Sequence, residues 1–320
     1  MTEKQGVKTE DNKNVSILQP KNDIVFQTLF SRGKESITKA ILEDILKIEI
    51  EKLDLDKTKE LLNDNQEDKN GRLDLRAVIN DNIECDIELQ LQVHKKAIER
   101  FLCYWSKVYS SNLKTGEKYT KLRKTISIVI TGERIGSLKE IKKAHTKWQI
   151  REEDYKNIIL TKDLELHIIE LPKAIEEYKK NPKDEVLQWM MFLENPEDME
   201  VKKIMENNED IKEAKNELDK ISMDEALRRR VLNQQIAEMD RKQFLDDAHE
   251  DGYNEGLEEG EAIGRASGIT EGILEAKINM IEKLIKKDMS IKDIADITDI
   301  EEEDIINIIN SKKINKPEGE

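Results

Sequence analysis

The 320-residue sequence predicts an α/β core followed by an extended α-helical C-terminal region. Polar and apolar residues alternate over 73–79 and again over 86–93, which predicts a β-hairpin. Two apolar runs, TISIVIT at 125–131 and LELHIIEL at 164–171, predict buried strands. Helical patterns flank these strands, and the chain beyond Pro172 is charged and helical. We therefore expect a mixed sheet with flanking helices, and then helices alone.

The composition is typical of a soluble protein with a modest core. Hydrophobic residues make up 37% of the chain and charged residues 38%, with a mean hydropathy of −0.72. No stretch approaches the roughly 18 apolar residues of a membrane span, and residues 1–14 are too polar for a signal peptide. The two cysteines are too few for a disulfide scaffold. We expect a cytoplasmic protein without membrane contact.

Charge is distributed unevenly along the chain, whose net charge is −15. Between His94 and Arg151, fifteen Lys/Arg stand against four Asp/Glu, a local net of +11. Residues 246–320 hold nine Lys/Arg and twenty-one Asp/Glu, a net of −12. A basic segment favours sequence-independent phosphate contacts, so the whole-chain charge does not exclude DNA. Each single lysine there is also explained by an ordinary solvated helix face, but the segment as a whole favours DNA binding.

We divide the chain into four parts. Residues 1–16 are polar and aperiodic and predict a disordered leader. Residues 17–200 hold the predicted α/β core, 201–245 a helical extension, and 246–320 an acidic helical tail. Glycines recur in this tail at every fourth position: Gly252, Gly256, Gly260, Gly264, Gly268 and Gly272. Because each glycine costs a helix about 1 kcal/mol relative to alanine, two interpretations stay open. The tail either self-associates or binds a partner helix, or it is a flexible, partly helical connector.

The predicted hairpin brings two carboxylates together. If Asn80, Asp81 and Asn82 form the turn, Asp74 lies directly opposite Glu88 on the polar face. Cross-strand partners have Cβ atoms roughly 4.5–5.5 Å apart, and like charges at that distance repel. In the same register Arg76 lies opposite Asp86, where we expect an ion pair.

A divalent cation would explain why two carboxylates face each other. Mg²⁺ is commonly held by one or two carboxylates, with water and substrate phosphate completing its shell. The ion polarises a phosphoryl oxygen and lowers the pKa of bound water, which then attacks phosphorus. Gln90 lies on the same face, two residues beyond Glu88, and is placed to orient water or phosphate. The alternative is that these carboxylates merely solvate the exposed face of a hairpin.

Five segments together resemble a known family: LQPKNDIVFQTLF, GRLDLRAV, IECDIELQLQ, ERFLCYWSKVYSSNLKTGEKYTKL and LELHIIELPK. Their order resembles that of the PD-(D/E)XK-family transposases, also called recombination-promoting nucleases, over roughly residues 17–310. The resemblance implies a restriction-endonuclease-like core and Mg²⁺-dependent DNA cleavage associated with recombination, with Mn²⁺ as a substitute ion. It places the motif aspartate on Asp74, the motif glutamate on Glu88 and the third motif position on Gln90.

Gln90 departs from the broad superfamily, which has lysine at this position, although glutamine is usual in this particular family. A lysine ammonium would stabilise an attacking hydroxide or a pentavalent phosphorane. A neutral glutamine only orients groups by hydrogen bonds. The departure bears on the rate of cleavage more than on metal binding.

Several further residues are candidates for a role beside this site. Asp23 is a further acidic group or, more simply, a helix cap. Lys21, Lys95 and Arg100 are candidate phosphate contacts. The four histidines, His94, His145, His167 and His249, show no metal-ligand spacing.

The sequence thus predicts a Mg²⁺-dependent DNA endonuclease in which Asp74 and Glu88 hold the metal and Gln90 positions water or phosphate. We expect DNA as partner and self-association through the C-terminal tail. Two rivals remain. One is a catalytically weak DNA-binding or assembly protein that keeps the nuclease fold. The other is a helical interaction scaffold in which the hairpin charges are solvated.

Overall fold

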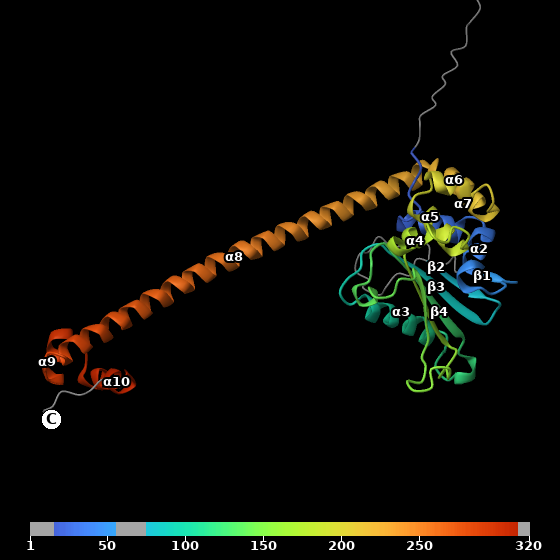
Figure 1. Cartoon of the computed structure of the whole chain (residues 1–320). Coiled ribbons are helices and arrows are strands. Elements are labelled where there is room, and N and C mark those ends of the chain that lie inside the picture. The colour runs from blue at the N-terminus through green and yellow to red at the C-terminus, as the bar shows by residue number, and fades with distance from the viewer. Residues whose placement is uncertain (1–15, 56–74, 313–320) are drawn as a thin grey trace, which may run out of the picture. The chain divides into compact units, whose positions relative to one another are not determined.

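The computed structural model describes residues 16–55 and 75–312 (Figure 1). Its internal contacts divide the chain into two compact units, Met1–Gln235 and Ile236–Glu320, and each is described by itself. No helix in the described part combines the length and apolar character needed to cross a membrane.

The first unit is built on a mixed sheet, which has six strands within the described residues. The order across the sheet is β1-β2-β3-β4-β6-β5. Strands β3, β4 and β6 are parallel to one another, whereas β1, β2 and β5 join antiparallel. The strands are β1 (Leu53–Leu55), β2 (Leu75–Ile79), β3 (Ile83–Gln90), β4 (Lys124–Thr131), β5 (His145–Trp148) and β6 (Leu164–Glu170). The mixed sheet with flanking helices confirms the predicted restriction-endonuclease-like fold class.

The β2–β3 hairpin adopts the predicted register. Ile79 pairs with Ile83 across the turn, and Leu75 pairs with Ile87. The turn residues Asn80 and Asp81 have φ angles of 49° and 62°, in the left-handed region that these two residue types tolerate best. Asp74 lies outside the described residues.

Helix α3 (Ala97–Ser111) covers one face of this sheet. Its buried residues Ala97 and Phe101 pack against Val129, Leu166 and Ile168 of β4 and β6. Because strand side chains alternate between faces, the neighbours of these residues along β4 and β6 point to the opposite face.

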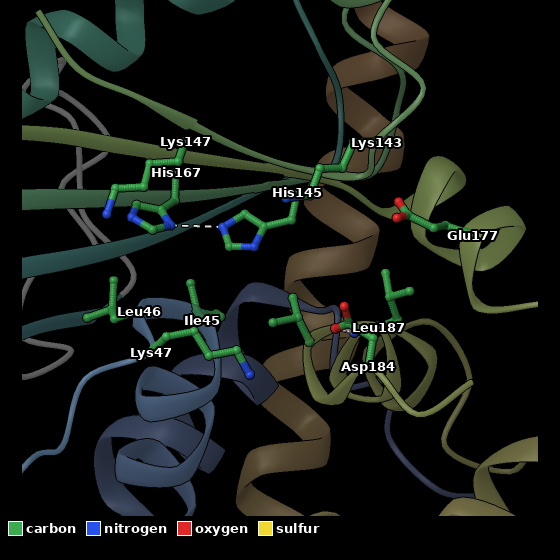
Figure 2. A pocket seen from close by; sticks show the side chains of 11 residues that line it. Ile45, Leu46, Lys47, Lys143, His145, Lys147, His167, Glu177, Asp184 and Leu187 are labelled. Carbon is green, nitrogen blue, oxygen red and sulfur yellow. Dashed lines mark hydrogen bonds between the residues drawn. The ribbon is translucent and has the colours of Figure 1, made fainter. Parts of the chain in front are cut away.

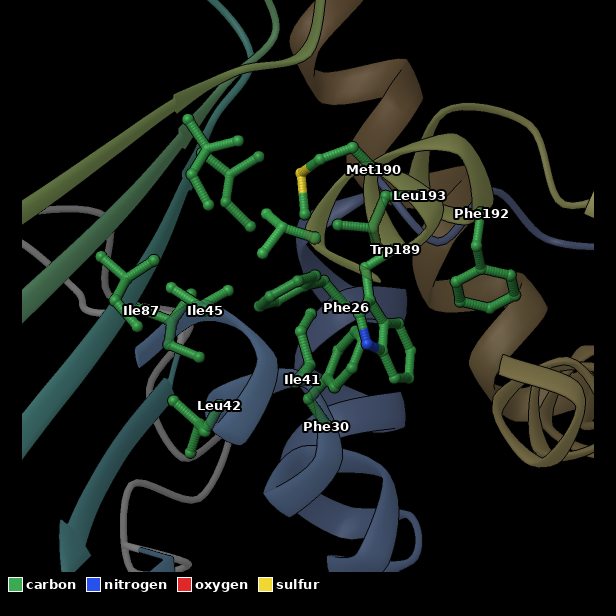
Figure 3. Packing of buried hydrophobic residues seen from close by; sticks show 14 of the residues in the cluster. Phe26, Phe30, Ile41, Leu42, Ile45, Ile87, Trp189, Met190, Phe192 and Leu193 are labelled. Atoms are coloured by element: carbon green, nitrogen blue, oxygen red, sulfur yellow. The ribbon is translucent and has the colours of Figure 1, made fainter. Parts of the chain in front are cut away.

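The opposite face carries the main core. Figure 3 shows Ile87 of the sheet beside Ile45, with Ile41, Phe26 and Trp189 deeper among the helices. Residues 189–193 of the helical region beyond Pro172 thus pack onto the α/β core. The helices in this unit are α1 (Asp23–Gln27), α2 (Glu35–Leu46), α4 (Leu171–Tyr178), α5 (Glu185–Glu194), α6 (Met199–Ile204) and α7 (Glu209–Ser222), with a π-helical turn at Thr28–Arg32.

The cap of α1 differs from the expectation. Asn22, not Asp23, is the N-cap residue, and its side-chain oxygen accepts hydrogen bonds from the backbone N–H groups of Ile24 and Val25. Asp23 is the first residue inside the helix, where an acidic side chain interacts favourably with the helix dipole. The capping role therefore belongs to its neighbour.

Helix α8 (Glu225–Ile285) begins in the first unit and continues into the second. All six tail glycines lie within this helix, and a Cβ added at any of them would meet nothing within 4 Å. In the second unit the end of α8 packs with α9 (Ile291–Thr298) and α10 (Glu302–Lys312). Five isoleucines form that small core: Ile281, Ile285, Ile294, Ile305 and Ile309.

We predict that Trp189→Ala lowers the free energy of unfolding by about 3–5 kcal/mol, the usual cost of an aromatic-sized cavity in a core. Trp189 is fully buried, and its Nε1 donates to Asp44 Oδ2 at 2.8 Å, so the variant loses packing and a hydrogen bond. Urea denaturation measures the effect. Met199→Ala, at a side chain that is 66% exposed, is the control and should stay within about 0.5 kcal/mol of the wild type.

Candidate functional site

Three carboxylates share the α3-facing side of β3. Glu84, Asp86 and Glu88 lie two residues apart along the strand, and their exposed fractions are 4%, 0% and 4%. The alternative that the Asp74 and Glu88 carboxylates merely solvate an exposed face is therefore wrong for Glu88, while Asp74 lies outside the described residues. Burial of a carboxylate is costly unless it is paired, hydrogen-bonded or protonated, and each of the three meets that demand differently.

Glu88 is paired with an arginine from the covering helix. Arg100 Nη2 lies 3.4 Å from Glu88 Oε1, and Arg100 Nε donates to the Tyr104 hydroxyl at 2.7 Å. The guanidinium also lies over the Tyr104 ring, 5.0 Å from its centroid. The Glu88 side chain is 6% exposed and that of Arg100 is 40% exposed. Arg100 thus joins a buried carboxylate to the surface.

Arg76, which was expected to pair with Asp86, pairs with Glu84 instead. Arg76 lies opposite Asp86 in the backbone register, as predicted, but its side chain reaches Glu84 Oε2 at 3.3 Å. Arg123 holds the other oxygen of Glu84 at 2.8 Å. The expected Arg76–Asp86 ion pair is therefore replaced by a two-arginine clamp on Glu84.

Asp86 is the least satisfied of the three carboxylates. Ser127 Oγ donates to its Oδ2 at 2.7 Å, while Oδ1 is buried and has no hydrogen-bond partner among the described residues. Burial raises the pKa of Asp86 to about 7, against the opposing effects of the Ser127 hydrogen bond and the Arg76 charge.

Gln90 ends β3 at the partly exposed edge of the site. Its amide Nε2 donates to the backbone oxygen of Gln92 at 2.8 Å, and its own backbone oxygen accepts from Gly132 N at 3.0 Å. A Cβ at Gly132 would lie 2.6 Å from the oxygen of Leu91, so only glycine allows β4 to end this close to β3. This close approach positions the strand end that carries Gln90.

The other candidate residues lie at separate places. Lys21 forms an ion pair with Glu194 Oε1 at 2.7 Å, near the end of α5. Lys95 is exposed in the segment between β3 and α3, one turn before Arg100. Of these basic residues, only Arg100 contacts a site carboxylate in the described structure.

The donor set was tested for a divalent cation. Glu88 offers a buried carboxylate, the ligand type that Mg²⁺ prefers. No group of three His, Cys, Asp or Glu side chains within residues 16–55 and 75–312 is arranged to hold a metal ion. The chemistry of Glu88 fits such an ion, and the expected second carboxylate, Asp74, lies outside these residues.

The model of the PD-(D/E)XK nuclease family transposases matches residues 20–248, about 70% of the chain. The chain belongs to this family. Searches of curated proteins and of solved structures gave no significant match. Membership supports a nuclease- or transposase-associated function, implies a DNA substrate, and fits the divalent metals that PD-(D/E)XK nucleases generally use.

A second polar cluster of this PD-(D/E)XK chain was missed in the sequence. His145 Nε2 lies 2.8 Å from His167 Nδ1 (Figure 2). His167 Nε2 in turn lies 2.9 Å from Glu165 Oε1. The alternation in LELHIIEL already placed Glu165 and His167 on one face. His145 joins them only through the pairing of β5 with β6, which no local pattern indicated.

We predict that Asp86→Asn stabilises the protein at about pH 8 by roughly 2–4 kcal/mol. The folded-state pKa of Asp86, about 7, lies above its ordinary value of 3.8, so the wild type loses stability as the pH rises from about 4 to about 7. The variant lacks that loss and still accepts from Ser127. Urea denaturation across this pH range measures the difference.

Asp54→Asn, at an exposed position of β1, is the matched control and should follow the wild type at every pH. If Asp86→Asn were instead destabilised at about pH 8, the buried carboxylate would have to be held ionised by an interaction that outweighs its burial.

Proposed function

We propose that this protein is a metal-dependent DNA endonuclease associated with recombination or transposition. Asp74 and Glu88 hold Mg²⁺, for which Mn²⁺ substitutes, and Gln90 orients water or phosphate. The observation that carries the proposal is the buried Glu88 carboxylate on the central hairpin of a PD-(D/E)XK family member. The hairpin register supports placing Asp74 opposite it, because the neighbouring pair Leu75–Ile87 follows the predicted pattern.

The residues of the chain divide the work. A bound divalent cation would polarise a phosphoryl oxygen of the substrate and lower the pKa of a water molecule bound to it. Glu88 contributes a carboxylate whose burial keeps water from competing for the ion. The Gln90 amide, which hydrogen-bonds Gln92 O, exchanges that bond for one to water or phosphate. A cation held by Glu88 would compete with Arg100 for this carboxylate, and the exposed guanidinium of Arg100 would then be free to pair with a DNA phosphate.

DNA binding is proposed for the basic region around α3. Lys95 and Arg100 lie before and within the first turns of this helix, and Lys107 follows over the Tyr104 ring. Such side chains give sequence-independent and salt-sensitive affinity. We further propose a cytoplasmic protein that self-associates through its C-terminal helices, whose acidic surface disfavours DNA contact.

A catalytically weak DNA-binding protein is the second candidate, and Gln90 favours it. The superfamily lysine would add a positive charge next to the reacting phosphate, which the amide of Gln90 does not provide. In that case metal and DNA still bind, and cleavage is slow.

We predict that Glu88→Gln and Asp74→Asn each lower Mg²⁺-dependent plasmid nicking on the order of 100-fold, the scale of one lost catalytic group. Asp81→Asn, at the turn of the same hairpin, is the control and should nick as the wild type does. Equal nicking by all four proteins would refute the site. Metal and DNA binding without nicking in the wild type would favour the second candidate.

Arg100→Gln is predicted to move two affinities in opposite directions. DNA binding weakens and the slope of log affinity against log salt falls by about 1, because one phosphate contact is lost. Mn²⁺ binding strengthens, because the competing cation at Glu88 is gone. Calorimetry measures the affinity for Mn²⁺, and fluorescence anisotropy with a labelled duplex measures the affinity for DNA. Arg123→Gln, which removes an arginine from Glu84 instead, serves as the control. Weaker Mn²⁺ binding by Arg100→Gln would contradict the proposed role.

A further inference from the structure

A cavity of about 300 Å³ lies on the sheet face opposite Glu88 (Figure 2). The strand register establishes the face: Glu88 pairs with Val129 and Val129 with Ile168, so His167, the neighbour of Ile168, points to the other side. One wall of the cavity is apolar and comes from α2 and α5, with Ile45 and Leu187 among its residues. The polar wall comes from β5, β6 and the segment before β5.

A hydrogen-bonded chain determines the tautomers of the two histidines in the polar wall. Burial opposes ionisation of Glu165, but hydrogen bonds from His167, Lys124 and Lys147 hold its pKa well below its usual value. An ionised carboxylate only accepts, so His167 donates from Nε2 and accepts at Nδ1. His145 therefore donates from Nε2 to His167, which leaves its Nδ1 as an acceptor.

The imidazole of His145 is neutral, and three lysines act on it electrostatically. Burial, the neighbouring His167 and the charges of Lys143, Lys147 and Lys47 together lower the pKa of His145 to about 3. All three lysines line the cavity. These three positive charges favour an anion next to His145, on the side of the cavity away from its two carboxylates, Glu177 and Asp184.

The other two lysines of the lining already form ion pairs, and its two carboxylates already accept hydrogen bonds from backbone N–H groups. Lys47 pairs with Glu185 at 2.7 Å, and Lys147 pairs with Glu165 at 2.6 Å. Glu177 accepts from the backbone N–H of Ala144 at 2.6 Å, and Asp184 caps α5 by accepting from Leu187 N.

Two groups that line the cavity have hydrogen-bonding capacity that no described residue uses. Lys143 is exposed and forms no hydrogen bond or ion pair with another described residue, and no described residue donates to His145 Nδ1. The cavity therefore presents one unmatched ammonium, which donates, and one unmatched imidazole nitrogen, which accepts. A ligand that satisfies both must carry an anionic oxygen beside a hydrogen-bond donor.

We propose that this cavity binds a phosphate monoester or inorganic phosphate in its singly protonated form. Lys143 pairs with the anionic oxygens, and His145 Nδ1 accepts a hydrogen bond from the P–OH group. The second pKa of a phosphate monoester is about 6, so the P–OH group is present near that pH. The apolar wall formed with Ile45 and Leu187 receives the remainder of an ester. The site is separate from the proposed metal site and does not depend on it.

Titration calorimetry on the full chain near pH 6 tests the site with sodium phosphate, sodium sulfate and deoxyadenosine 5′-monophosphate. Phosphate is expected to bind at least about tenfold more tightly than sulfate, because sulfate has no proton to donate to His145, and one hydrogen bond of this kind is worth about a factor of ten. Tighter binding of the nucleotide than of phosphate identifies an ester as the ligand. Equal or weaker nucleotide binding identifies free phosphate.

Lys143→Met separates this site from general attraction of anions. The variant is expected to weaken phosphate binding about tenfold, whereas Lys142→Met, at the exposed neighbour that does not line the cavity, leaves it unchanged. Both changes lie on the surface and spare the core. Binding should also weaken as the pH rises from about 6 to about 8, since the P–OH group is lost. Equal affinity for sulfate, equal loss in the two lysine variants, or no phosphate binding by the wild type would each overturn the proposal.

Discussion

The structure depends on the compensation of three carboxylates buried on one strand. β3 is covered on both faces, so Glu84, Asp86 and Glu88 have lost the water that would solvate them. Two arginines hold Glu84, a serine and an elevated pKa accommodate Asp86, and Arg100 from α3 reaches Glu88. Helix α3 is thus held over the sheet by charge as well as by the packing of Phe101. Under the proposed function, a cation at Glu88 would alter the same Arg100 contact that helps to hold this helix.

The two faces of the sheet support different chemistry. The α3 face places buried carboxylates beneath a helix that carries Arg100 and Lys107, and the proposed function assigns the metal and DNA contacts to this face. The opposite face is mostly apolar, and its polar part is confined to the β5–β6 edge, where His167 and His145 form a chain that ends in a cavity. Adjacent residues such as His167 and Ile168 serve different faces because strand side chains alternate. The side chains of β6 therefore contribute to both faces of the sheet.

Local patterns in the sequence predicted much of this fold. The turn chemistry of Asn80 and Asp81 and the alternation around it gave the hairpin register that the described residues adopt. The two apolar runs predicted β4 and β6. The short strands β1 and β5 were not predicted, because three or four residues of an edge strand carry too little pattern to stand out from a loop.

The sequence by itself determined which side chains share a face, because the period of a strand and the residue preferences of a tight turn are local properties. Only the tertiary structure decided that the polar face of β3 is buried, that Arg76 turns to Glu84, and that Arg100 reaches Glu88. Burial and ion pairing depend on which element covers a face, and α3 begins several residues beyond the strand it covers. The meeting of His145 with His167 likewise required the pairing of β5 with β6, a contact between segments 22 residues apart.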